Sequence, residues 1–223
     1  MTNTRLELAI GVAGLAGFLI TTVLVLSGAS QSTDFQATLQ VNQYDLGPIG
    51  TSLMVVLTDY GREVVWGLLV VVTFLLGDKR TKLVAVELVL LFVVGIFLGD
   101  ALKILISRQR PLDSGIILRV PADIGPSSFP SGHALIVSIG AALCAVRFRH
   151  KAVAAVLIVE ATLVCYSRVY VGVHYATDIV GGVFLGIAIA LLGAPLFDKY
   201  LRAILEKLLE PIVLVLREGP LNV

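Results

Sequence analysis

Apolar residues along this chain gather in long uninterrupted runs, which short charged or proline-rich stretches separate. A helix needs about 20 consecutive apolar residues to cross the hydrocarbon core of a bilayer. The runs predict six membrane spans, near residues 8–26, 62–77, 83–106, 131–146, 152–170 and 177–196. We therefore expect an all-α fold, a polytopic membrane helical bundle, in which residues 1–223 form a single membrane domain.

The stretches between these runs predict shorter elements. Residues 28–47 are polar and predict a loop, or a loop that contains a short helix at the membrane surface. Residues 49–57 are too few to cross a bilayer, so we expect an interfacial helix or a lead-in to the second span. The loop 107–130 contains four prolines and two glycines, which excludes a span. Residues 198–217 mix charges with leucines at helical spacing and predict an amphipathic helix at the membrane surface.

A cleaved signal peptide is the alternative interpretation of the first apolar run. Ser27 and Ala29 are small residues of the kind that precede a cleavage site. The apolar run is long, however, and only Arg5 provides a positive charge before it. We therefore expect a retained first span.

Composition supports a membrane protein. The 223 residues are 57% hydrophobic and 15% charged, whereas a soluble domain has about 25% charged residues. This excludes a disordered chain, a collagen and a disulfide scaffold, and Cys144 and Cys165 both lie inside apolar runs as expected of buried hydrophobes. A net charge of +1 gives no electrostatic attraction to nucleic acid, so we expect no nucleic-acid partner.

Basic residues set the predicted topology. The turns at 79–82 and 147–151 are short and basic, which is typical of cytoplasmic loops. A second group of ionisable residues then falls on the outer side, against this rule, and ionisable groups at membrane depth are functional candidates. The group comprises Lys103, Arg108, Arg110, Arg119, His133, Arg168, His174 and Asp178.

Three segments carry most of this group. Lys103 and Arg110 are about two helical turns apart, so they can share one helix face before Pro111 ends the helix. The sequence Pro130-Ser131-Gly132-His133 opens the fourth span, where free backbone amides and the helix dipole favour phosphate.

The third segment is Ser167-Arg168, followed by His174 and Asp178. If the sixth span begins near Gly172, His174 and Asp178 lie one turn apart on one face. A carboxylate there can fix the imidazole tautomer and leave the other ring nitrogen free to attack.

Together these residues predict a site for a phosphate or another tetrahedral oxyanion. The cations and amides can neutralise charge on the equatorial oxygens, one histidine can attack phosphorus, and the other can protonate the leaving oxygen. No cluster of carboxylates and histidines in the sequence offers a zinc or magnesium cage, so we expect chemistry without a metal or a cofactor.

The motifs Lys103-x6-Arg110-Pro111, Pro130-Ser131-Gly132-His133 and Ser167-Arg168-x5-His174-x3-Asp178 resemble the three signature motifs of the type 2 phosphatidic acid phosphatase family, which is related to vanadium haloperoxidases and glucose-6-phosphatase. The resemblance implies that His174 is the nucleophile that forms a phosphohistidine, that Asp178 orients it, and that His133 is the general acid. It further implies that the phosphate oxygens are held by Lys103, Arg110, Ser131, the Gly132 amide and Arg168.

One position departs from the family pattern. Many relatives place a further arginine after Arg-Pro, where this chain has Leu112, so an extra phosphate contact does not carry over. Thr58 and Gly61 resemble a weaker feature of the family, to which the sequence assigns no role. Outside the motifs, we expect Arg108 and Arg119 to be solvated or to meet lipid head groups, and Asp100 to pair with Lys103.

We therefore expect a multi-pass cell-membrane phosphatase whose partners are the bilayer and a lipid phosphate or diphosphate, bound at the extracytoplasmic face. Polyprenyl diphosphate, phosphatidic acid and phosphatidylglycerol phosphate all remain open as substrates. Two other classes also remain open: a phosphotransferase that passes the phosphoryl group to another lipid, and a channel or transporter. Nothing in the sequence sets the oligomeric state.

Overall fold

A computed structural model describes residues 4–112, 115–121, 125 and 127–217, and all regular structure in these residues is helical. The helices are α1 (Thr4–Leu26), α2 (Gln31–Asn42), α3 (Gly47–Val56), the π-helix η1 (Leu57–Val65), α4 (Trp66–Leu76), α5 (Lys79–Ile106), α6 (Gly132–Arg147), α7 (Lys151–Tyr170), α8 (Ala176–Tyr200) and α9 (Arg202–Arg217). The expected all-α helical bundle is confirmed.

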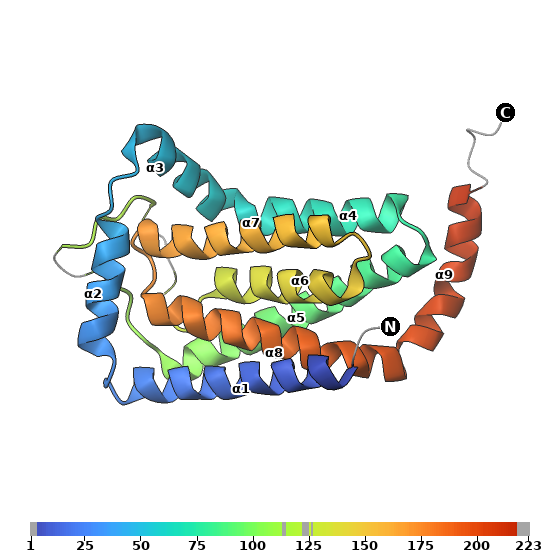
Figure 1. Cartoon of the computed structure of the whole chain (residues 1–223), viewed down its shortest axis with the longest axis horizontal. Helices are drawn as coiled ribbons and strands as arrows, with labels where there is room; N and C mark the ends of the chain where they lie inside the picture. Colours follow the sequence, from blue (N-terminus) through green and yellow to red (C-terminus); the bar gives the residue numbers. More distant parts are fainter. Residues whose placement is uncertain (1–3, 113–114, 122–124, 126, 218–223) are drawn as a thin grey trace.

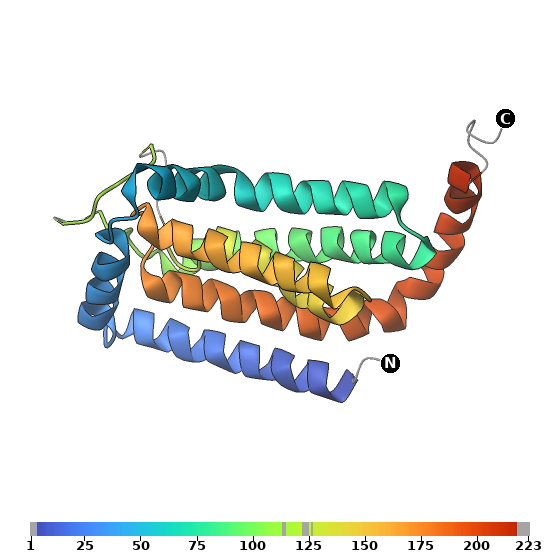
Figure 2. The same cartoon turned by 45° about the horizontal axis from the view of Figure 1, so that its top comes forward.

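The long helices lie side by side, and α6 occupies the centre of the bundle, where it packs against α5, α7 and α8 (Figure 1). Helix α1 packs along α8, and α2 lies across one end of the bundle, which we call the α2 end. Turning the molecule shows that α9 leaves the bundle at the opposite end (Figure 2). Both ends of the loop 107–130 lie at the α2 end, although parts of that loop fall outside the described residues.

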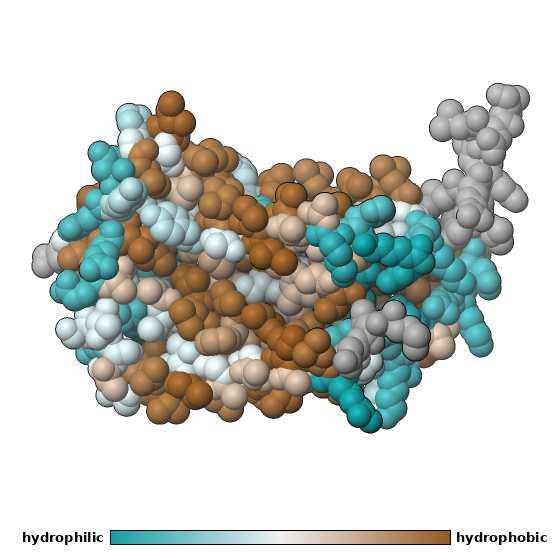
Figure 3. Space-filling view, in the orientation of Figure 1, coloured by the Kyte–Doolittle hydropathy of each residue, from teal (hydrophilic) through white to brown (hydrophobic). Residues whose placement is uncertain are grey.

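The surface matches a membrane-embedded bundle. Figure 3 shows a broad hydrophobic band over the middle of the helices, with hydrophilic surface towards both ends. Helices α1, α5, α7 and α8 are long and apolar enough to cross a membrane, and α6 is a shorter apolar helix. Large apolar side chains on these helices are exposed, such as Phe97 on α5 and Val156 on α7, as expected where lipid rather than protein covers a helix.

The second predicted span differs from the structure. It was expected at 62–77, with residues 49–57 as an interfacial helix or a lead-in. The structure supports the lead-in, because α3, η1 and α4 follow one another without a break from residue 47 to residue 76. The polar residues Asp59, Arg62 and Glu63 divide this region into two apolar segments in the sequence. In the structure these residues lie on η1, which joins the two segments. The helix predicted for 198–217 starts at Arg202 instead, because α8 continues through Pro195 to Tyr200.

The helices approach closely where glycine faces a neighbour. A Cβ atom placed on Gly140 of α6 would lie 2.1 Å from the ring of Trp66, and one on Gly186 of α8 would lie 2.6 Å from the backbone oxygen of Leu135. Small residues at such contacts let membrane helices pack backbone to backbone. At the end opposite α2, buried Arg147 binds Glu87 at 2.8 Å and Asp198 at 3.0 Å, which ties α6 to α5 and α8.

The contact between Gly140 and Trp66 makes a testable prediction about stability. Gly140→Ala should lower the free energy of unfolding by about 1–3 kcal/mol, because the added methyl group overpacks a filled core. Gly67→Ala is the matched control: Gly67 neighbours Trp66 on α4, and its Cβ position meets no atom within 4 Å. Thermal unfolding in detergent should therefore show a lower midpoint for Gly140→Ala only, and equal midpoints would contradict the packing.

Candidate active site

The residues singled out by the three motifs converge at the α2 end of the bundle. The end of α5, the loop that follows it, the start of α6 and the turn between α7 and α8 all meet there (Figure 1). Several of these residues are deeply buried, which is expensive for charged groups unless they are paired.

His174 and Asp178 form the buried pair at the centre. His174 is 2% exposed and Asp178 is fully buried, and His174 Nδ1 lies 3.2 Å from Asp178 Oδ2. The contact does not arise from one helix face, as the spacing suggested, because α8 begins only at Ala176. His174 precedes the helix, and Asp178 reaches back from its first turn to accept the backbone N–H of Tyr175 at 2.9 Å.

The second oxygen of Asp178 binds Arg108. Arg108 Nη1 lies 2.6 Å from Asp178 Oδ1, and Arg108 Nη2 lies 2.6 Å from Oδ2 of Asp34 on α2. Asp34 is buried and also accepts the backbone N–H of Thr177 at 3.0 Å. The expectation that Arg108 is solvated was therefore wrong, since its guanidinium bridges two buried carboxylates.

Arg110 faces the other side of the imidazole ring. Its Nη1 lies 3.4 Å from His174 Nε2 and donates to the carbonyl of Val173 at 2.7 Å. Arg110 does not share a helix face with Lys103, because α5 ends at Ile106 and Ser107 takes a left-handed conformation with φ of 47°. The loop, rather than the helix, brings Arg110 to His174.

Arg168 lies in the last turn of α7 and is 7% exposed. Its Nη1 donates to Thr58 Oγ1 of η1 at 3.1 Å, whereas its Nε is buried without a hydrogen-bond partner in the described residues. A buried cationic N–H with no partner is costly. This nitrogen is therefore a natural donor to a bound anion.

Helix α6 presents its N-terminus to the same region. Ser131 is the N-cap, fully buried, and its hydroxyl accepts the N–H of Ala134 at 3.5 Å. Lys103 Nζ lies 3.2 Å from the position of a Cβ on Gly132 and pairs with Asp100 at 3.3 Å, as expected from their spacing. His133 follows on α6, within electrostatic reach of Arg168 and Lys103.

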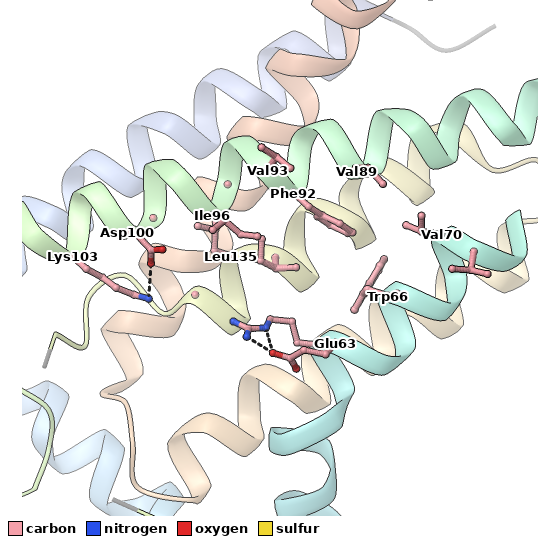
Figure 4. A pocket seen from close by; sticks show the side chains of 17 residues that line it. Glu63, Trp66, Val70, Val89, Phe92, Val93, Ile96, Asp100, Lys103 and Leu135 are labelled. Atoms are coloured by element: carbon pink, nitrogen blue, oxygen red, sulfur yellow. Dashed lines mark hydrogen bonds and ion pairs between the residues drawn. The ribbon is translucent and has the colours of Figure 1, made fainter. Parts of the chain in front are cut away.

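A groove leads away from this N-terminus along the bundle. Its volume is about 720 Å³, and its walls come from η1, α4, α5 and α6 (Figure 4). Polar side chains line the part near Gly132, and apolar ones such as Val70, Phe92 and Ile96 line the rest. A groove with a charged end and an apolar body fits an amphiphilic molecule.

Burial and neighbouring positive charges both favour the neutral imidazole of His174. Burial first, and then the positive charges of Arg168, Arg110 and Lys103, hold the pKa of His174 well below its ordinary value of 6.5. With Nδ1–H donating to Asp178, the lone pair is on Nε2, which faces Arg110. A neutral, oriented imidazole beside cations is suited to attack an anionic phosphorus centre.

The described residues contain no group of three or more histidine, cysteine, aspartate or glutamate side chains that could hold a metal ion. The sequence analysis missed two residues at this site, Asp34 and Arg62, which lie outside the three motifs. It named Arg108 without a partner and Thr58 without a role. The Thr58-x-x-Gly61 pattern was the one signal that pointed to η1.

Comparisons with known proteins identify the family of the chain. Residues 82–202 match the family model described as the PAP2 superfamily. The chain is 39% identical over 175 residues to an undecaprenyl-diphosphatase of Sulfolobus acidocaldarius, an alignment that covers 76% of this chain and 82% of that protein. It is 26% identical over 144 residues to the undecaprenyl-diphosphatase BcrC of Bacillus subtilis, covering 63% and 72%.

Solved structures show the same fold. The crystal structure of a transmembrane PAP2 type phosphatidylglycerolphosphate phosphatase from Bacillus subtilis superposes with a TM-score of 0.70 at 26% identity, covering 86% of this chain and 98% of that one. Aquifex aeolicus LpxE superposes with a TM-score of 0.63 at 23% identity, covering 72% and 93%, and supports the fold alone.

The lowered pKa of His174 predicts its protonation state. An ordinary histidine with a pKa of about 6.5 is mostly protonated at pH 6, whereas His174 should remain neutral there with its proton on Nδ1. Nitrogen-15 NMR of histidine-labelled protein in detergent measures both properties, and the spectrum of His174→Gln identifies the signal among the three histidines. An imidazolium signal at pH 6, or a proton on Nε2, would contradict the assigned environment.

Proposed function

The chain belongs to the PAP2 superfamily and is a membrane lipid phosphatase, and we propose that it hydrolyses a polyprenyl diphosphate at the extracytoplasmic face through a phosphohistidine intermediate. The observation that carries this proposal is the buried His174, oriented by Asp178 with its free Nε2 beside Arg110. The 39% identity to an undecaprenyl-diphosphatase favours a polyprenyl diphosphate over the other lipid phosphates.

The proposed reaction has two displacement steps. His174 Nε2 attacks the terminal phosphorus, the bond from that phosphorus to the bridging oxygen breaks, and the lipid monophosphate leaves with a proton from His133. Water then attacks the phosphohistidine, the bond from phosphorus to Nε2 breaks, His133 accepts a proton of that water, and inorganic phosphate and free His174 result. Over the two steps His133 gives up one proton and regains one, so the protons balance.

The surrounding groups suit the charge that develops on phosphorus. Arg110 lies in the loop after α5, and Arg168 lies in the last turn of α7. Together with Lys103 and the N-terminus of α6, they supply donors for the equatorial oxygens. Because the set carries several positive charges, it can stabilise the transition state without a metal ion.

The positions of the basic turns support an extracytoplasmic site. The turns at 79–82 and 147–151 lie together at the end opposite α2, where Arg80, Arg147 and Arg149 line one pocket. If basic turns face the cytoplasm, the α2 end with His174 faces outward.

Phosphate release from a panel of lipids tests the function. The purified protein with excess EDTA should release inorganic phosphate from undecaprenyl diphosphate faster than from phosphatidylglycerol phosphate or phosphatidic acid. Loss of turnover in EDTA that magnesium restores would contradict a metal-free mechanism. Transfer of phosphate to a second lipid, without release to water, would instead identify a phosphotransferase.

In the same assay, His174→Ala should abolish turnover of every substrate, because no neighbouring side chain can form the phosphohistidine. His133→Ala should lose about 10²–10⁴-fold on phosphatidic acid, whose alkoxide leaving group needs a proton, and much less on an aryl phosphate. Equal losses on both substrates would show that His133 is not the general acid.

Cysteine labelling tests the orientation. A cysteine in place of Tyr44, which is exposed between α2 and α3, should react with a membrane-impermeant maleimide in intact cells, and one in place of Lys151 should not. The native Cys144 and Cys165 are buried and serve as an unreactive background. The reverse labelling pattern would place the site on the cytoplasmic side.

A further inference from the structure

Arg62 is a positive charge beside the site that none of the three motifs contains and that the reaction above does not use. It lies on the π-helix η1, where the groove meets the N-terminus of α6. We propose that Arg62 binds the lipid-proximal phosphate of a diphosphate substrate, the phosphate that stays on the lipid, and so makes the enzyme selective for diphosphates. This inference rests on the proposed function, since it assumes that His174 takes the terminal phosphate.

The position of Arg62 supports a role in binding an anion. Its Nη1 lies 3.7 Å from the Cβ position of Gly132, and Lys103 Nζ lies 3.2 Å from the same point. Two cations from different helices thus converge on the start of α6, where the backbone amides are free. Arg62 is also within electrostatic reach of His133 and Arg168.

The present partner of Arg62 is a weak one. Its guanidinium pairs with the carboxylate of the adjacent Glu63, and the two side chains are 32% and 49% exposed. An ion pair between two partly exposed neighbours contributes little to stability. A phosphate, which accepts two parallel hydrogen bonds from a guanidinium, can therefore replace Glu63 as the partner.

The π-helix fixes the direction in which Arg62 points. Thr58 accepts a hydrogen bond from Arg168, and a Cβ on Gly61 would lie 2.5 Å from Val164, so this turn of η1 is held tightly against α7. Arg62 comes next in the chain and lines the groove instead. π-Helical segments occur frequently at functional sites, and here η1 carries both the support for Arg168 and the added cation.

The order of groups in the groove matches the order of groups in the substrate. A polyprenyl diphosphate carries its terminal phosphate, its lipid-proximal phosphate and its apolar chain in sequence. Arg110 and Arg168 act on His174, Lys103 and Arg62 meet at Gly132 at the charged end of the groove, and the apolar walls around Phe92 and Ile96 continue from there (Figure 4). A monophosphate has no group that would lie at Arg62.

Arg62 would contribute to the reaction as well as to binding. When the bond between the terminal phosphorus and the bridging oxygen breaks, the electron pair of that bond moves onto the lipid-proximal phosphate. A guanidinium at this phosphate stabilises the growing negative charge, an interaction that is stronger in the transition state than in the ground state. Removal of Arg62 should therefore lower kcat and also raise KM.

The test compares a prenyl diphosphate with the prenyl monophosphate of the same chain length. Arg62→Gln should lower kcat/KM for the diphosphate by about 10- to 100-fold, the loss expected for a hydrogen bond to a charged group. The monophosphate should change by less than about threefold. Arg149→Gln, which removes an exposed charge at the opposite end, is the matched control and should behave as the wild type.

Glu63→Gln separates a substrate contact from a structural ion pair. It breaks the pair but leaves Arg62 free, so it should keep or improve activity on the diphosphate. A loss of activity for Glu63→Gln as large as that for Arg62→Gln would overturn the proposal. So would a loss for Arg62→Gln that is the same on the diphosphate and the monophosphate, or no loss on either substrate. Thermal unfolding and vanadate binding check that Arg62→Gln folds. A wild-type protein that releases no phosphate from either lipid would contradict the proposed function itself.

Discussion

The fully buried carboxylate of Asp178 constrains the whole α2 end of the molecule. A carboxylate removed from water is tolerated only when hydrogen bonds and opposite charges surround it. Here it accepts from the backbone of Tyr175, faces His174, and binds Arg108 at 2.6 Å. Arg108 in turn needs Asp34, so α2 must lie across this end to supply that second carboxylate.

This arrangement connects the start of α8 with three other parts of the chain. Asp34 and Thr38 of α2 accept the backbone N–H groups of Thr177 and Ala176, which are free because α8 begins there. Helix α2 therefore closes the first turn of α8 while it neutralises Arg108. The imidazole of His174 is held in place by this closed network rather than by contacts of its own loop alone.

The sequence was sufficient for the fold class and for the three motifs that converge at the α2 end, but not for how their residues meet or for the part played by Asp34 and Arg62. Apolar run length predicts membrane helices directly, and basic residues on the outer side are conspicuous because they oppose the charge rule. Spacing failed for Lys103 and Arg110, since a left-handed Ser107 ends α5 between them. It also failed for the start of α8, because a helix cap brought His174 to Asp178 where a helix face was expected.

Arg108 and Arg62 were beyond sequence reasoning for a different reason. The role of each depends on partners distant in the chain: Arg108 on Asp34, 74 residues away, and Arg62 on the start of α6. A lone arginine at a membrane boundary is compatible with solvent, with a head group or with a substrate, and only its neighbours in space decide among them. The π-helical form of η1, which directs Arg62 into the groove, has no periodic signature in the sequence.

The distribution of charge at this end explains why the site is suited to anions. The two buried carboxylates, Asp34 and Asp178, are both bound by Arg108, so they neutralise that one cation, and among the residues that the structure describes Arg110 and Arg168 form no ion pair with a carboxylate. Arg110 donates to backbone carbonyls, and Arg168 Nε has no hydrogen-bond partner among the described residues. Two positive charges therefore remain close together with little compensation. Such an arrangement lowers the stability of the empty protein, and a bound phosphate removes that cost by supplying the missing negative charge. The same carboxylates that fix the nucleophile therefore also determine which cations remain available to the substrate.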